Sequence, residues 1–200
     1  MTYKGYEFEA WKIGGTLTEY EYHKMIDILE KCSSKRICEL GSGQSTLIFE
    51  KYCEKYDNVV FYSIEHDETY RRKNSIIFPL IENTEINVNG HVYGDCNKYD
   101  GFEEWLKQQN KFDFILIDGP YGYDFRLKYT YSRVQLLSFI ELDKISDKAV
   151  VLYHDSERDN AKTTLNEFEK LIFERGFEYT KEVINENENR ELTIYNLSKK

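Results

Sequence analysis

The chain has 200 residues, 40% of them hydrophobic, and carries a formal net charge of −9 at pH 7. This length suits one domain over residues 1–200, in which residues 1–34 form an N-terminal segment and helix. No apolar run approaches the roughly 18 residues that a membrane span needs, and residues 1–10 lack the apolar core of a signal peptide. We therefore expect a cytoplasmic protein with no membrane span, and the absence of a basic stripe excludes a typical nucleic-acid binder.

The first half of the chain alternates helical and strand patterns. Thr18 and Glu21 form a capping-box pattern, and glycines 41 and 43 interrupt the chain directly after an apolar run. The predicted elements are a helix from Thr18 to about Cys32, a strand over Arg36–Leu40, a helix capped by Ser45 and running to about Lys55, a strand over Val59–Ile64, a short helix from about Glu68, and a third strand within Ile86–Tyr93.

The second half continues the alternation and then departs from it. The predicted elements are a helix from Asp100 to about Asn110, a strand over Phe112–Ile117, a helix with Val134, Leu137 and Ile140 on one face, a strand over Ala149–Tyr153, a helix to about Arg175, and two strands over Phe177–Ile184 and Glu191–Leu197. The last two strands are separated by an Asn/Glu-rich turn, which predicts an antiparallel hairpin. We therefore expect a Rossmann-like α/β fold with a mostly parallel, seven-stranded sheet that closes with this hairpin.

Polar residues follow each predicted parallel strand. In open α/β sheets, ligands bind beyond the carboxyl ends of the strands. The residues expected at a cofactor site are Glu39, Gly41, Ser42, Gly43 and Ser45 after strand one, Glu65 and His66 after strand two, Asp95 after strand three, and Asp118 after strand four. The glycines permit close backbone approach to a ligand, and Glu65 suits the two hydroxyls of a ribose. Thr46 stands where a dinucleotide-binding motif would have its third glycine, which disfavours a nicotinamide cofactor.

These motifs resemble those of class I methyltransferases. The segment Glu39–Ser45 is similar to their first motif, Glu65 to their second-strand acid, and Asp95 to the residue that meets the adenine amine. Locally, residues 118–126 and 151–158 resemble the segments that follow strands four and five in plant glucuronoxylan 4-O-methyltransferases. The resemblance implies S-adenosylmethionine as the cofactor and a sugar or glycan hydroxyl as the methyl acceptor.

Three residues are candidates for activating that hydroxyl. Asp118, His154 and Asp155 follow neighbouring strands, so one of them can act as the base that removes the proton. Alternatively, the three side chains hold Mg²⁺, Mn²⁺ or Co²⁺, which lowers the pKa of the hydroxyl. The third interpretation is structural, with Asp155 as the N-cap of the following helix.

The loop before the helix with Val134 is rich in tyrosine and basic residues. Tyr121 and Tyr123 offer faces for a sugar ring, Arg126 suits an acidic or phosphate group, and Arg158 is a further substrate contact. Trp11 with the following glycine pair is a candidate lid, although both it and the loop could simply pack on the domain. A non-catalytic cofactor-binding domain remains the alternative from outside the enzymes, and the oligomeric state is left open.

Overall fold

The computed structural model describes residues 1–8, 17–120, 130–187 and 190–200, and side chains 186–190 are not described. Tyr121, Tyr123, Arg126 and the Trp11 segment lie outside the described residues, so their predicted roles stay predictions.

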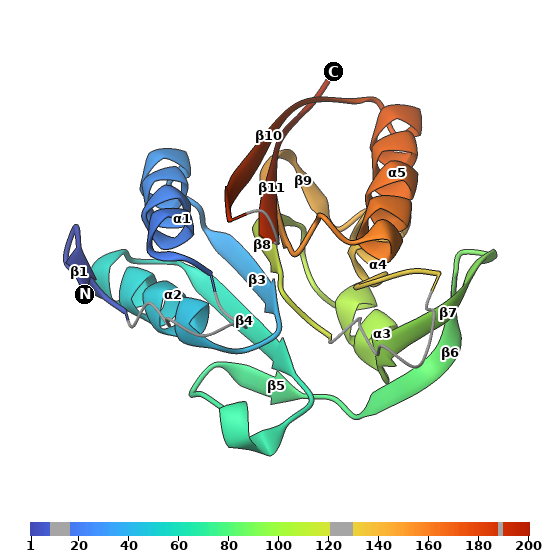
Figure 1. The fold of residues 1–200 in the computed structure, drawn as a ribbon, viewed down its shortest axis with the longest axis horizontal. Coiled ribbons are helices and arrows are strands. Elements are labelled where there is room, and N and C mark those ends of the chain that lie inside the picture. Colours follow the sequence, from blue (N-terminus) through green and yellow to red (C-terminus); the bar gives the residue numbers. More distant parts are fainter. Residues whose placement is uncertain (9–16, 121–129, 188–189) are drawn as a thin grey trace.

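A seven-stranded sheet forms the centre of the molecule, in the order β10-β11-β9-β8-β3-β4-β5 (Figure 1). The strands are β3 (Arg36–Leu40), β4 (Val60–Glu65), β5 (Ser75–Ile77), β8 (Phe112–Ile117), β9 (Ile145–His154), β10 (Phe177–Asn187) and β11 (Arg190–Lys199). The first five are parallel, and β11 runs antiparallel to both β9 and β10. The predicted fold class and its closing hairpin are therefore confirmed.

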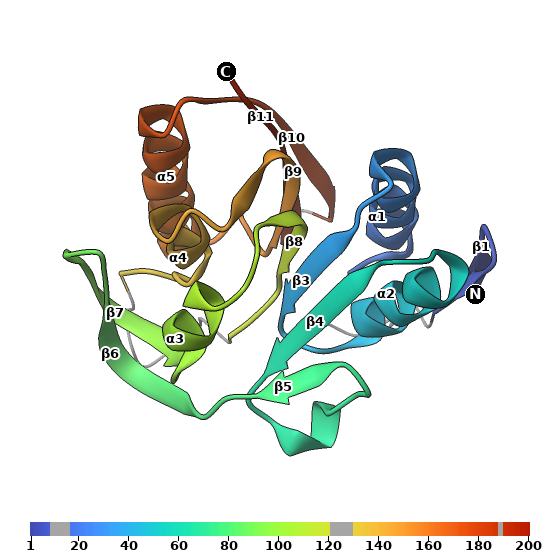
Figure 2. The same ribbon diagram turned by 180° about the vertical axis from the view of Figure 1, so that it is seen from behind.

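Helices cover both faces of this sheet, as Figures 1 and 2 show from opposite sides. They are α1 (Glu19–Cys32) and α2 (Gln44–Lys55) on one face, and α3 (Phe102–Lys107), α4 (Leu136–Glu141) and α5 (Asp159–Glu174) on the other. The capping box predicted for α1 is present, with Thr18 and Glu21 each bonding the other's backbone. The predicted cap of α2 is wrong by two residues, because Gly43 is the N-cap and Ser45 lies inside the first turn.

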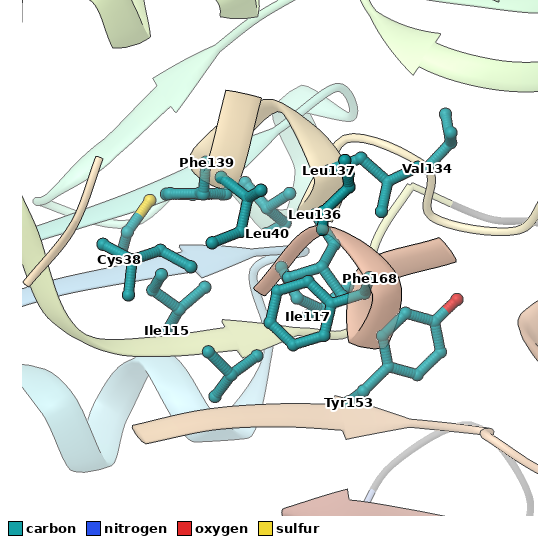
Figure 3. Close-up of a cluster of buried hydrophobic side chains, with 14 of the residues drawn as sticks. Cys38, Leu40, Ile115, Ile117, Val134, Leu136, Leu137, Phe139, Tyr153 and Phe168 are labelled. Carbon is teal, nitrogen blue, oxygen red and sulfur yellow. The ribbon is translucent and has the colours of Figure 1, made fainter. Parts of the chain in front are cut away.

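Successive strand residues point to two separate apolar cores. Ile37, Phe114 and Leu152 pack with α1 and α2, whereas Leu40 and Ile117 pack against the opposite helices. Figure 3 shows this second core, in which residues of the sheet meet those of α4 and α5. A strand buried on both faces must be apolar almost throughout, which explains the continuous hydrophobic runs in the sequence.

The predicted third strand is wrong. Ile86–Tyr93 belongs to a separate antiparallel hairpin of β6 (Leu80–Val88) and β7 (His91–Tyr99), while the third parallel strand of the sheet is the short β5. The hairpin turns at Asn89-Gly90, where both residues have positive φ, as a tight two-residue turn requires. Its apolar side chains Ile86, Val88 and Tyr93 join the core beside α4.

A short N-terminal hairpin of β1 (Thr2–Tyr3) and β2 (Tyr6–Glu7) and a single 3-10 turn over Glu68–Tyr70 complete the described elements. The short helix predicted from about Glu68 is thus present as this 3-10 turn. None of the described helices is long and apolar enough to cross a membrane.

The side-chain amide of Gln135 fixes the end of the hairpin to the start of α4. Its Oε1 accepts from the Tyr99 backbone N–H at 2.7 Å, and its Nε2 donates to the Tyr99 carbonyl at 3.0 Å. We expect Gln135→Met to lower the free energy of unfolding by about 2–4 kcal/mol, because two buried backbone groups lose their partner. Urea denaturation measures this, with Gln109→Met as a control that removes only a 3.4 Å bond to the Trp105 carbonyl. Equal stability of the two variants would contradict the expectation.

Candidate active site

The carboxyl ends of β3, β4, β8 and β9 bring most of the predicted site residues together. The chain leaves β3 toward β4 on one side and returns to β8 on the other, which makes this a switch in strand order. At that switch the turn after β3 touches the turn after β8. A Cβ on Gly41 would lie 2.8 Å from the Gly119 nitrogen, and Gly41 has a φ of +96°. Only glycine fits there without moving backbone.

Gly43 is different, because a Cβ added to it would meet no described atom within 4 Å. The backbone before α2 therefore borders open space, and a ligand can approach it closely. Thr46 is fully buried beside it, accepting from the Gly43 N–H at 2.9 Å and donating to Glu39 at 2.7 Å. The residue that replaces the third glycine of a dinucleotide motif is thus an integral part of this turn.

Glu39 is a completely buried acid with no basic partner among the described residues. Its carboxyl group accepts hydrogen bonds from the hydroxyls of Ser45, Thr46 and Ser63. Burial raises the pKa of Glu39 to about 7, against the lowering effect of these hydroxyl donors. Near pH 7 the carboxyl group is therefore about half protonated, and its hydrogen bonds hold the turn together. Its role as a cofactor contact stays a prediction.

Glu65 ends β4 and organises the two turns around it. Its Oε2 accepts from the Ser42 N–H at 2.8 Å, and its Oε1 accepts from the N–H groups of His66 and Asp67 at 2.7 and 3.0 Å. The His66 Nδ1 also lies 2.7 Å from Oε1. The carboxylate that the sequence assigns to a ribose is therefore held in place from both sides.

Asp118, His154 and Asp155 form a cluster at the ends of β8 and β9. His154 Nδ1 lies 2.9 Å from Asp118 Oδ1, and Nε2 lies 3.8 Å from Asp155 Oδ1. Burial lowers the pKa of His154, but the carboxylates of Asp118 and Asp155 together outweigh burial, and the net pKa is raised. His154 and Asp155 are buried, whereas 21% of the Asp118 side chain is exposed. Asp118 is therefore the member of the cluster that an acceptor can touch.

Two arginines neutralise this cluster. Arg133 Nη2 lies 3.1 Å from Asp118 Oδ1 and 2.9 Å from Asp155 Oδ2, and Arg158 Nη2 lies 2.9 Å from the same Asp155 oxygen. Potential ligand atoms of Asp118, His154 and Asp155 do lie within 4.8 Å of one another, which is compact enough for a metal ion. One oxygen of each carboxylate, Asp118 Oδ1 and Asp155 Oδ2, already contacts a guanidinium group, so a divalent cation could not bind these two oxygens while Arg133 is in place.

The structure also gives the positions of three further residues named in the sequence analysis. Asp155 is not a helix cap, because α5 begins later and its N-cap is Arg158. Asp95 is not at the end of a parallel strand but within the hairpin, where it bonds Thr130. Its predicted position after a parallel strand is therefore wrong, and its assignment to the adenine amine stays a prediction. Ser42 lies at the turn, with its hydroxyl 2.7 Å from that of Ser63.

Sequence reasoning missed Tyr99. This residue comes from the hairpin, yet its hydroxyl would contact a Cβ added to Gly119 at only 2.3 Å. The side chain is fully buried, and the hydroxyl has no hydrogen-bond partner among the described residues. A buried, unpaired hydroxyl above the Gly41–Gly119 contact is a candidate ligand contact. The Asn89-Gly90 turn is the sequence signal that could have revealed the hairpin that carries it.

A cavity of about 480 Å³ borders the first turn of α2, where Gln44 and Leu47 line it together with Met1, Phe8 and Arg72 among others. It contains none of the charged strand-end residues, so we place the site by its chemistry and not by this cavity.

Comparison with solved structures finds the same fold in methyltransferases. A proposed O-methyltransferase from Klebsiella pneumoniae is similar over 93% of this chain and 83% of its own, with 11% identity and a TM-score of 0.61. TomG, an O-methyltransferase of tomaymycin synthesis from Streptomyces achromogenes solved with S-adenosylmethionine, is similar over 92% and 82%, with 10% identity and a TM-score of 0.61. Precorrin-6y C5,15-methyltransferase from Geobacter metallireducens is similar over 94% of both chains, with 12% identity and a TM-score of 0.52.

No protein-family model and no curated protein matches the sequence. The chain therefore has the fold of class I methyltransferases, and at these identities the likeness establishes the fold alone. The resemblance to glucuronoxylan methyltransferases gains no support from these comparisons.

The buried acid of the turn predicts a specific pH dependence. Glu39 keeps its proton in the folded protein up to about pH 7, whereas in the unfolded chain it ionises near 4.5. Since the folded state binds more protons between these values, rising pH should lower the free energy of unfolding, by on the order of 3 kcal/mol. Glu39→Gln removes this contribution. Urea denaturation from pH 4.5 to 8 should show a wild-type decline that the variant lacks, and parallel profiles would contradict the assignment.

Proposed function

We propose that this protein is an S-adenosylmethionine-dependent methyltransferase that methylates a hydroxyl group of a small molecule. One observation carries the proposal. The open backbone at Gly43, the fixed carboxylate of Glu65 and the partly exposed carboxylate of Asp118 share one edge of the sheet, at its switch in strand order. Solved structures with this fold, including one with S-adenosylmethionine bound, support the cofactor.

The turn residues fit such a cofactor better than a dinucleotide. Glu65 has carboxylate oxygens already oriented by backbone N–H groups, so it can accept from the hydroxyls of a ribose with little reorganisation. Gly43 leaves room for a ligand beside the first turn of α2, and Tyr99 offers an unpaired hydroxyl nearby. Thr46 fills the position where a pyrophosphate-binding turn needs glycine.

When bound, S-adenosylmethionine supplies an electrophilic methyl group. The contribution of the protein is to place the acceptor oxygen in line with that group and to take its proton. Asp118 is the exposed member of the Asp118–His154 pair, so its carboxylate is the group that receives the proton. Its Oδ2 has no hydrogen-bond or ion-pair partner in the described part of the chain, while Oδ1 is held by His154 and Arg133. The proton that leaves the acceptor oxygen then resides on the Asp118 carboxyl group, whose other oxygen stays in contact with His154 Nδ1.

For the acceptor, we propose an acidic or phosphorylated sugar. The support comes from the sequence of the loop after β8, in which Tyr121 and Tyr123 can pack on a sugar ring and Arg126 can bind an anionic group. Arg158 is a weaker candidate than the sequence indicates, because its guanidinium is paired with Asp155. The alternative acceptor is another small hydroxylated molecule, and the alternative function is cofactor binding without catalysis.

Cofactor binding should stabilise the protein. At a concentration of S-adenosylmethionine 100 times its Kd, we expect a gain of about 2.7 kcal/mol, which is a rise in Tm of roughly 5–10 °C for a domain of this size. Glu65→Gln should reduce the rise, because an amide nitrogen would replace one of the carboxylate acceptors. Thermal-shift assays and calorimetry measure both effects. The exposed variant Glu54→Gln is the control, and stabilisation by NAD but not by S-adenosylmethionine would refute the cofactor assignment.

The base should affect turnover and not cofactor affinity. With labelled cofactor and a panel of sugar acids, sugar phosphates and phenols, we expect Asp118→Asn and His154→Gln to lower kcat by about 100-fold or more. The Kd for S-adenosylmethionine should stay within about twofold in both variants. The control is His91→Gln, because His91 lies in the hairpin and pairs with Glu141 of α4. Wild-type turnover in both site variants would show that Asp118 and His154 do not take part in the reaction. If the folded wild type binds the cofactor but transfers methyl to no acceptor, the result would favour the alternative of cofactor binding without catalysis.

A further inference from the structure

We propose that the guanidinium of Arg133 takes the place of a divalent cation between Asp118 and Asp155, so that the site works without a metal ion. This inference rests on the proposed methyltransferase function. It assigns to Arg133 a positioning role in which it acts through Asp118 and does not itself touch the acceptor.

The geometry of Arg133 is that of a fixed bridging cation. One nitrogen, Nη2, contacts a carboxylate oxygen from each of the two strand ends, at 3.1 Å from Asp118 and 2.9 Å from Asp155. The other, Nη1, donates to the backbone carbonyl of His154. The guanidinium therefore links the ends of β8 and β9 at three points, which a mobile surface arginine does not do.

Arg133 is also buried, with only 5% of its side chain exposed. Burying a charge costs desolvation free energy unless the charge is fully paired, and here both carboxylates offset that cost by pairing with the guanidinium. The Cζ atom lies 5.9 Å from the centre of the Tyr153 ring, which adds a cation–π contact beneath the cluster. The position is thus built to hold a permanent positive charge.

The charges of the cluster are balanced without a metal. Asp118 and Asp155 carry two negative charges, and Arg133 and Arg158 supply two positive ones. A divalent cation that bound Asp118 Oδ1 and Asp155 Oδ2 would lie against Arg133 and would have to displace it. His154 Nδ1 is likewise engaged, because it lies 2.9 Å from Asp118 Oδ1.

Arg133 supplies part of what a metal would supply. It holds Asp118 Oδ1 in place, so that Oδ2 of the same carboxylate is oriented to accept a proton. It offers no Lewis acid to the acceptor hydroxyl, so proton removal must come from the Asp118–His154 pair. The class of mechanism is therefore general-base catalysis beside a fixed guanidinium.

The test is a titration of the full chain with Mn²⁺, followed by electron paramagnetic resonance of the free ion. We expect no stoichiometric binding to the wild type, and one Mn²⁺ bound per chain of Arg133→Met. That binding should disappear in Arg133→Met/Asp155→Asn, which restores the charge balance by removing one carboxylate. The matched control is Arg175→Met, which removes an arginine from the buried Glu141 and should bind no Mn²⁺.

Two results would overturn the proposal. One is stoichiometric Mn²⁺ binding by the wild type that Asp155→Asn abolishes, and this measurement requires no arginine variant to fold. The other is a folded Arg133→Met that binds no Mn²⁺, because the guanidinium would then not occupy a cation position. Calorimetry with S-adenosylmethionine on the same wild-type sample tests the methyltransferase function separately from the role of Arg133. A failure of cofactor binding refutes the methyltransferase function, but the Mn²⁺ titration still shows whether the cluster binds a metal ion.

Discussion

The close contact of two backbone turns determines the geometry of the site. Gly41 follows β3 and Gly119 follows β8, and neither has room for a Cβ because each lies against the other. The Asp118 N–H donates to the Leu40 carbonyl at 2.8 Å, and the Gly41 N–H donates to the Ile64 carbonyl at 2.8 Å. The ends of three strands are therefore joined in register, and the carboxylates that follow them are brought to one edge. A side chain at either glycine would separate the cofactor region from the proposed base.

The site contains buried acids that are stabilised in two different ways. Glu39 has only hydroxyl donors, which cannot fully replace water around a charge, and its pKa rises to about 7. Asp118 and Asp155 have guanidinium partners and stay suited to carrying charge. The first arrangement makes a structural anchor for the glycine turn, and the second makes a group that can exchange a proton. The same functional group, a carboxyl group, thus has two roles that are set by its partners.

The sequence predicts the parts of this structure that depend on local patterns. The capping box of α1, the apolar runs of β3 and β8 and the antiparallel pairing of β10 with β11 each have a strong signal over a few residues. The three-residue strand β5 has too short a pattern to detect, and the longer hairpin after it carried the apolar signal instead. Asp95 was misplaced for that reason. Tyr99 and Arg133 could not be assigned, because their roles arise from tertiary contacts with Gly119 and with two strand ends.

The charge distribution narrows what the acceptor can be. The chain carries a net charge of −9, so an anionic acceptor needs a local excess of positive charge to approach the site. The two arginines closest to the proposed base cannot provide it, because Arg133 and Arg158 are paired with Asp118 and Asp155. Glu65 adds a further negative charge at the same edge of the sheet. An acidic or phosphorylated sugar would therefore depend on the basic residues of the loop after β8, Arg126 and Lys128. Without their positive charges, the negative charge at this edge of the sheet favours a neutral hydroxyl compound. Whether the acceptor is anionic or neutral therefore depends on whether Arg126 and Lys128 contact it.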